Sequence, residues 1–136
     1  MKITLMYAGI LALIFLVLSA RIVLMRRSGG PNLGDGGDPI MLRLIRGHAN
    51  FAEYVPFILL MIGFLEASHI NANILHGIGL TLVISRLLHG YALSFSESFK
   101  FGRTAGTALT FLLLLVGGVL CLYQAFQPVT LPAVGG

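Results

Sequence analysis

Residues 43–57 read RLIRGHANFAEYVPF, and they place two arginines, an asparagine and a glutamate in a stretch that otherwise has the composition of a membrane-spanning helix. A charged side chain at membrane depth costs about 2.5 to 3.5 kcal/mol on insertion scales, so several together indicate a function. At 3.6 residues per turn, these side chains share roughly 100° of one helical face. The face comprises Arg43, Arg46, Asn50 and Glu53, with Tyr54 at its border. We expect it to be turned away from lipid.

The composition of the whole chain is that of an integral membrane protein. Of 136 residues, 57% are hydrophobic and only 10% are charged, and the mean hydropathy is +0.92. Apolar stretches cover residues 3–25, 49–67, 70–93 and 105–126. Each reaches the length of about 20 residues that a helix needs to cross a bilayer core. None alternates with period two, so helices are favoured over a barrel. The sequence therefore predicts an all-α bundle of four transmembrane helices, with residues 1–136 as one domain.

Breaker residues separate the four stretches. After Arg27 the chain reads SGGPNLGDGGDP, which does not continue a helix. Asp38 is expected to cap the second helix and Pro39 to occupy its first position. Residues 68–73 and 94–102 are expected to form the other two connections. Glycines at 77, 79, 117 and 118 indicate close helix packing.

The cations are unevenly distributed between the two ends of such a bundle. One end carries Arg26, Arg27, Arg43, Lys100 and Arg103, whereas the other carries only Lys2. The positive-inside rule then places both basic connections in the cytoplasm and both termini outside. A net charge of +4 with this distribution reflects membrane topology and gives no argument for binding nucleic acid.

Further cations are expected near the cytoplasmic end, where every helix contributes at least one. They are Arg21 on the first helix, Arg86 and His89 on the third, and Arg103 beside Thr104 on the fourth. Guanidinium groups pair with carboxylates in a bidentate geometry. A site built from them suits a small, flexible anion with more than one carboxylate, and glutathione has two carboxylates, an amine and a thiol.

The second helix resembles a signature of the MAPEG family, the membrane-associated proteins in eicosanoid and glutathione metabolism. Residues 43–56 match its Arg-x-x-Arg-x-x-x-Asn-x-x-Glu pattern followed by Tyr and Pro, and residues 86–89, RLLH, are also similar. The resemblance covers nearly the whole chain. It implies a homotrimer in the lipid bilayer, of the bacterial type in the inner membrane, with glutathione between neighbouring subunits near the cytoplasmic side.

The same resemblance assigns roles to individual residues. Arg103 resembles the arginine placed near the sulfur in catalytic members, which makes it the expected catalytic residue. One position departs from the pattern, since Leu93 stands where familiar members have a tyrosine. The expected glutathione-binding residues are Arg21, Arg46, His48, Asn50, Glu53, Tyr54 and Arg86.

Three functions follow from these observations. The first is a glutathione-dependent transferase or peroxidase, in which a cation stabilises the thiolate for attack on an apolar electrophile or lipid hydroperoxide without a metal. The second is a glutathione-binding protein without turnover, an alternative that Leu93 keeps open. The third is a small transporter with Glu53 as its proton-coupled carboxylate, which the surrounding arginines disfavour because they repel cations.

Structural roles are the alternative for the same residues. Arg43 is expected at the interface, reaching lipid phosphate. Arg46, Asn50 and Glu53 are alternatively a network that holds the bundle together, and Arg21 and Arg103 are alternatively anchors at the membrane surface. Arg86 and His89 are alternatively partners of Glu53 or of backbone carbonyls.

Overall fold

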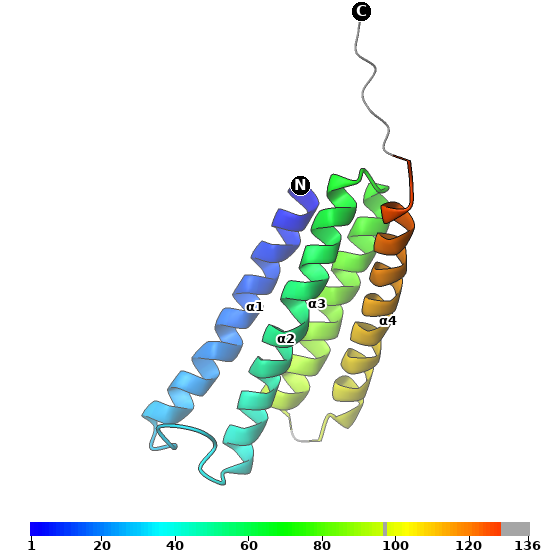
Figure 1. The fold of residues 1–136 in the computed structure, drawn as a ribbon. Coiled ribbons are helices and arrows are strands. Elements are labelled where there is room, and N and C mark those ends of the chain that lie inside the picture. Colours follow the sequence, from blue (N-terminus) through cyan, green and yellow to red (C-terminus); the bar gives the residue numbers. More distant parts are fainter. Residues whose placement is uncertain (97, 129–136) are drawn as a thin grey trace, which may run out of the picture.

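The protein is built from four long α-helices, as the apolar stretches predict (Figure 1). The structure, a computed structural model, describes residues 1–96 and 98–128. The helices are α1 Lys2–Arg27, α2 Pro39–Ala67, α3 Ala72–Ser94 and α4 Lys100–Ala125. All four are long and apolar enough to cross a membrane. The number, length and apolar composition of the helices confirm the prediction of an all-α, four-helix membrane protein.

Both basic connections lie at one end of the bundle, which we call the loop end. Figure 1 shows the α1–α2 and α3–α4 connections there, while the N-terminus and the end of α4 lie at the opposite end. The arrangement agrees with the alternating topology expected from the charges. The side of the membrane that the loop end faces stays a prediction from the positive-inside rule.

Helices α2 and α3 form the centre of the bundle. Each packs against the other and against both α1 and α4, whereas α1 and α4 do not contact each other within the described residues. Apolar side chains such as Leu11, Ile58, Ile62 and Leu82 are almost completely buried between the helices. The outer helices therefore expose broad apolar surfaces, as expected of segments surrounded by lipid.

The start of α2 follows the sequence prediction. The Asp38 side chain accepts hydrogen bonds from the backbone N–H groups of Ile40 at 2.8 Å and Met41 at 3.4 Å, and Pro39 is the first helical residue. These bonds satisfy amides that have no partner within the helix. The cap begins α2 more than one turn before Arg46, so the polar face lies on continuous helix.

The start of α4 differs from the prediction. Residues 94–102 were expected to be a connection, but α3 ends at Ser94 and α4 begins at Lys100. Gly102 lies inside α4, where a Cβ atom would come within 2.9 Å of the Leu88 carbonyl oxygen. The glycine therefore allows α4 to approach α3 closely and does not end a helix. As a result Arg103 lies in the first turns of α4, at the loop end.

Candidate functional site

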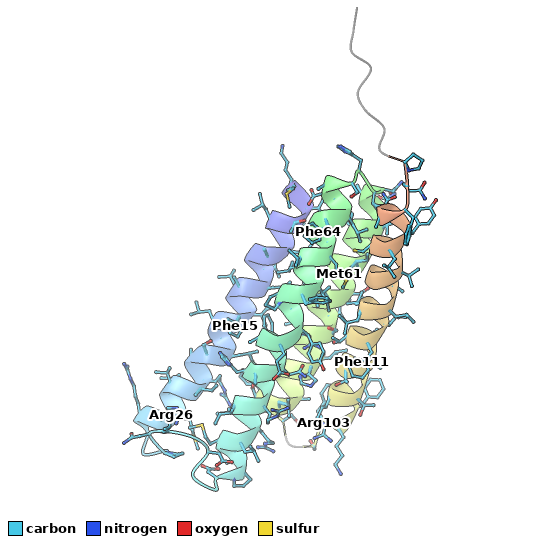
Figure 2. All side chains as sticks on the ribbon, viewed as in Figure 1. Phe15, Arg26, Met61, Phe64, Arg103 and Phe111 are labelled. Carbon is cyan, nitrogen blue, oxygen red and sulfur yellow. The ribbon has the colours of Figure 1, made fainter. Side chains whose placement is uncertain are left out.

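A polar cavity of about 360 Å³ opens between α2, α3 and α4 at the loop end. Three of its lining residues come from the predicted polar face of α2, at a spacing that places them on one side of the helix. Figure 2 shows Arg103 on α4 at this end of the bundle. The lining residues are Leu42, Arg43, Arg46, Asn50, His89, Leu93 and Arg103, and we call this space the arginine cavity.

The charges around the arginine cavity have one sign. Three guanidinium groups line it, and its lining includes no carboxylate. Arg46 and Arg103 are exposed, whereas Arg43 is half-buried. Leu42 and Leu93 supply an apolar part of the wall. This combination suits an anionic ligand that also carries less polar groups, because guanidinium binds carboxylate or thiolate while the leucines contact carbon.

The remaining residues of the α2 signature lie outside the arginine cavity. Glu53 is exposed, and Tyr54 is half-buried with its ring 6.2 Å from that of Phe111 on α4. Within one chain, Glu53 therefore does not lie among the arginines that line the cavity. The predicted common face of Arg43, Arg46 and Asn50 agrees with their common cavity, which Arg43 lines although it was expected at the lipid interface. Glu53 and Tyr54 do not line this cavity.

Arg86 is buried in the bundle and does not line the arginine cavity. Its side chain is 1% exposed. One terminal nitrogen donates to Asn50 Oδ1 at 2.6 Å, and Nε donates to Ser85 Oγ at 3.2 Å. The other terminal nitrogen donates to Thr110 Oγ1 and to the Gly106 carbonyl. Arg86 thus joins α2, α3 and α4. Its partners are the Asn50 amide, two hydroxyl groups and a backbone carbonyl, and Glu53 is not among them.

Arg21 and His48 lie on another side of the protein, between α1, α2 and α3. Arg21 donates a hydrogen bond to the Ser94 carbonyl at 2.5 Å, and its guanidinium carbon lies 4.3 Å from the centre of the Phe95 ring. It lines a second cavity of about 380 Å³ together with the hydroxyl-bearing Ser28. The structure therefore separates Arg21 from the arginine cavity of the same chain.

The imidazole of His48 packs against α1. Its Nε2 lies 3.1 Å from Ser19 Oγ, and its ring stacks on Phe15 with the ring centres 4.5 Å apart. The Ser19 hydroxyl donates to the Phe15 carbonyl at 2.9 Å, so the imidazole Nε2–H is the donor toward Ser19. His48 thus faces away from Arg46, as the angle between their positions on one helix requires.

Two polar residues of this region were not singled out from the sequence. Ser85 and Thr110 are both buried partners of Arg86. His89, 5% exposed, was named among the cations near the cytoplasmic end but not among the expected glutathione-binding residues, and it lines the arginine cavity. A signal for Thr110 exists in the sequence, because Gly102, Gly106 and Thr110 repeat every four residues and mark the face of α4 that packs on α3.

Comparison with known proteins agrees with this architecture. The profile of the MAPEG family matches residues 4–123, which is nearly the whole chain. The chain belongs to the MAPEG family. This confirms the family resemblance and makes the protein an integral membrane protein from a family of glutathione and eicosanoid metabolism. Whether this MAPEG protein forms a homotrimer stays a prediction.

Its curated relatives include inner membrane proteins. "Inner membrane protein YecN" of Escherichia coli K12 is 30% identical over 111 residues, which cover 82% of this chain and 83% of the relative. The same protein from Escherichia coli O6:H1 strain CFT073 matches with the same identity and coverage. No solved structure matches this MAPEG chain. The relatives' names specify a location and no activity.

Proposed function

We propose that this MAPEG protein is a glutathione-dependent membrane transferase or peroxidase. In this proposal glutathione binds at the arginine cavity, and its thiolate attacks an apolar electrophile or a lipid hydroperoxide. The observation that carries the proposal is the convergence of Arg43, Arg46 and Arg103 on one cavity at the loop end. Family membership supplies the ligand class that such a cavity fits.

The cavity matches glutathione in charge and size. Glutathione carries two carboxylates, and each guanidinium presents a pair of N–H donors to a carboxylate. A volume of about 360 Å³ lies within the usual range for small-molecule sites of roughly 300 to 1,000 Å³. The same cations argue against a cationic drug as the ligand of this cavity, because it would be repelled. Glu53, the carboxylate of the transporter alternative, lies outside the cavity.

Arg103 is the proposed catalytic residue. A thiol with a pKa near 8.5 is mostly protonated at neutral pH, and a neighbouring cation favours its thiolate. Lowering that pKa by about two units takes only about 2.7 kcal/mol of preferential stabilisation. Arg103 is exposed at the wall of the cavity, where its guanidinium is accessible to a bound thiol.

The second substrate is proposed to reach the site from the bilayer. Helices α1 and α4 expose large apolar side chains along their length, such as Leu13, Leu16, Phe111 and Leu115. A hydrophobic electrophile dissolved in lipid therefore meets these helices first. The proposed location is the inner membrane, by similarity to the relatives, with the loop end in the cytoplasm.

We also propose that neighbouring subunits complete the site. Arg21 and His48 lie on a different side of the chain from the arginine cavity, so a single subunit divides the expected binding residues into two groups. In a trimer, the Arg21 and His48 group of one subunit would lie beside the arginine cavity of the next subunit. The expected binding residues would then form one site. Glu53, exposed in the single chain, is then available to a ligand held between subunits.

The decisive experiment is to record the absorbance of the glutathione thiolate against pH in purified protein. An enzyme of the proposed kind binds glutathione with a depressed thiol pKa, and Arg103→Ala removes that signal. Bound glutathione that remains protonated would support the alternative of a binding protein without turnover, which the apolar Leu93 at the cavity wall favours. A protein that binds no glutathione would contradict both.

A further inference from the structure

The guanidinium of Arg86 is held by acceptors from all three helices that surround the arginine cavity. Four hydrogen bonds run to Asn50 on α2, Ser85 on α3, and Thr110 and the Gly106 carbonyl on α4. A buried charge is strongly destabilising unless its donors are satisfied. All four acceptors are uncharged, so the positive charge of Arg86 is not neutralised by them. It adds to the positive potential near the cavity without occupying it.

Both hydroxyl partners of Arg86 are oriented by the backbone. Ser85 Oγ donates to the Leu82 carbonyl at 3.0 Å, and Thr110 Oγ1 donates to the Gly106 carbonyl at 2.7 Å. Each hydroxyl has a single proton, which these bonds use. The oxygens are thus left as acceptors toward Arg86, and the guanidinium has one favourable orientation.

That orientation determines which end of the Asn50 amide faces Arg86. A guanidinium has only donors, so it pairs with Oδ1 of Asn50, and the observed distance is 2.6 Å. Turning the amide over would place its NH₂ group against the donors of Arg86. Asn50 also lines the arginine cavity. With Oδ1 bonded to Arg86, the NH₂ group is the polar part of this side chain that is left for a ligand.

We infer that Arg86 is a positioning residue, which holds Asn50 as a hydrogen-bond donor toward an anionic group of the ligand in the arginine cavity. Thr110 and Ser85 complete the arrangement from positions outside the cavity. The inference rests on the proposed function and assigns Arg86 an indirect role in place of the direct glutathione contact expected from the sequence. It also specifies that the ligand group beside Asn50 is an acceptor, such as a carboxylate or thiolate.

The first test changes Thr110, which does not line the arginine cavity. Thr110→Val removes an acceptor of Arg86 at nearly constant volume, and Thr110→Ser keeps the hydroxyl. Glutathione affinity, measured by calorimetry on the full-length protein in detergent, is expected to fall severalfold in Thr110→Val and to return in Thr110→Ser. Thr107→Val is the matched control, because Thr107 makes the same type of bond to a carbonyl one turn back, at 2.9 Å, without contacting Arg86.

The second test concerns the amide of Asn50 itself. Asn50→Asp keeps an acceptor for Arg86, so the protein is expected to remain folded, but it replaces the donor toward the cavity with a carboxylate oxygen. Glutathione affinity is then expected to fall by about tenfold or more, since a hydrogen bond to a charged group is lost and a repulsion is gained. Unchanged affinity in this variant would show that the amide does not donate to the ligand and would overturn the inference.

The outcomes separate this inference from the proposed function. Unchanged affinity in folded Thr110→Val and Asn50→Asp, with binding lost in Arg46→Ala, overturns the role of Arg86 and leaves the glutathione site standing. A wild-type protein that binds no glutathione overturns both. Should Thr110→Val not fold, Ser85→Ala takes its place, because it removes the other hydroxyl acceptor of Arg86 and Ser85 does not line the arginine cavity.

Discussion

Gly106 on α4 lies directly against Ser85 on α3. A Cβ atom at position 106 would come within 2.7 Å of the Ser85 carbonyl oxygen and within 2.8 Å of the His89 Cβ atom. Backbone on one side and a buried imidazole on the other leave little room for relaxation. This contact is where α3 and α4 approach closely, next to the bonds that Arg86 makes with α4.

Gly106→Ala is therefore expected to destabilise the bundle. Overpacking of a tight contact costs about 1 to 3 kcal/mol. Gly118→Ala on the same helix is the control, because a Cβ atom there would meet nothing within 4 Å and alanine favours helix by up to about 1 kcal/mol. Thermal unfolding in detergent compares the two. Equal stability of both variants would show that α3 and α4 are less tightly packed than described.

Glu66 is expected to stabilise the first turn of α1. Its carboxylate accepts backbone hydrogen bonds from Ile3 at 2.9 Å and Thr4 at 2.8 Å, while the helix has no side-chain cap of its own. Glu66→Ala removes both bonds, and the melting temperature should fall by a few degrees. Glu66→Gln keeps one acceptor oxygen, so its melting temperature should fall less than that of Glu66→Ala. Equal melting temperatures for the wild type and Glu66→Ala would contradict the capping role.

Arg46→Ala and Glu53→Gln are both expected to weaken glutathione binding. Arg46 lines the arginine cavity, and losing a charge-assisted pair should reduce affinity by about tenfold or more. Glu53 lies outside that cavity within one chain, so its effect depends on a site shared between subunits. Calorimetry separates the cases. A loss in Arg46→Ala alone indicates a site within one chain, and no loss in either variant rejects the assignment.

Leu93→Tyr is expected to leave the fold intact and raise the proportion of bound glutathione in the thiolate form. Leu93 lines the arginine cavity, so the phenol hydroxyl of a tyrosine there can donate a hydrogen bond to sulfur. Leu93→Phe provides the same ring without the hydroxyl. Thiolate absorbance against pH measures the difference. If the tyrosine and phenylalanine variants agree, the hydroxyl at this position does not take part in thiol activation.

Mixed subunits test the shared site. Arg21→Ala and Arg103→Ala are each expected to lose glutathione-dependent activity, because the proposal requires Arg21 of one subunit beside Arg103 of the next. Co-expression of the two variants should restore part of the activity, since some sites then combine both intact arginines. Absence of recovery in confirmed mixed oligomers would place both arginines in the same chain's site or outside any site.

Much of the architecture was predictable from local sequence. Helix length follows from the apolar stretches, and the start of α2 follows from Asp38 and Pro39, because both depend on neighbours along the chain. The shared face of Arg43, Arg46 and Asn50 likewise follows from helical periodicity alone. These features needed no knowledge of which helix packs against which.

The roles of individual glycines could not be predicted from local sequence. Positions 77 and 79 have similar sequence surroundings and both indicated close packing, yet only Gly79 lies against another helix, where the Tyr7 ring packs on it. A Cβ atom at Gly77 would meet nothing within 4 Å. Gly102 was taken as part of a connection and instead lies in α4 against α3. Each role depends on the face that the neighbouring helix covers.

Local sequence thus accounts for four membrane-length helices, their loop-end cations and the polar face of α2. The packing of the helices decided that Arg103 joins this face, that Arg86 is buried behind Asn50, and that Arg21 and His48 lie elsewhere. Periodicity relates residues on one helix, because rise and turn are constant along it. The relation between helices depends on contacts far apart in the chain, where small residues and buried hydrogen bonds select one packing among several.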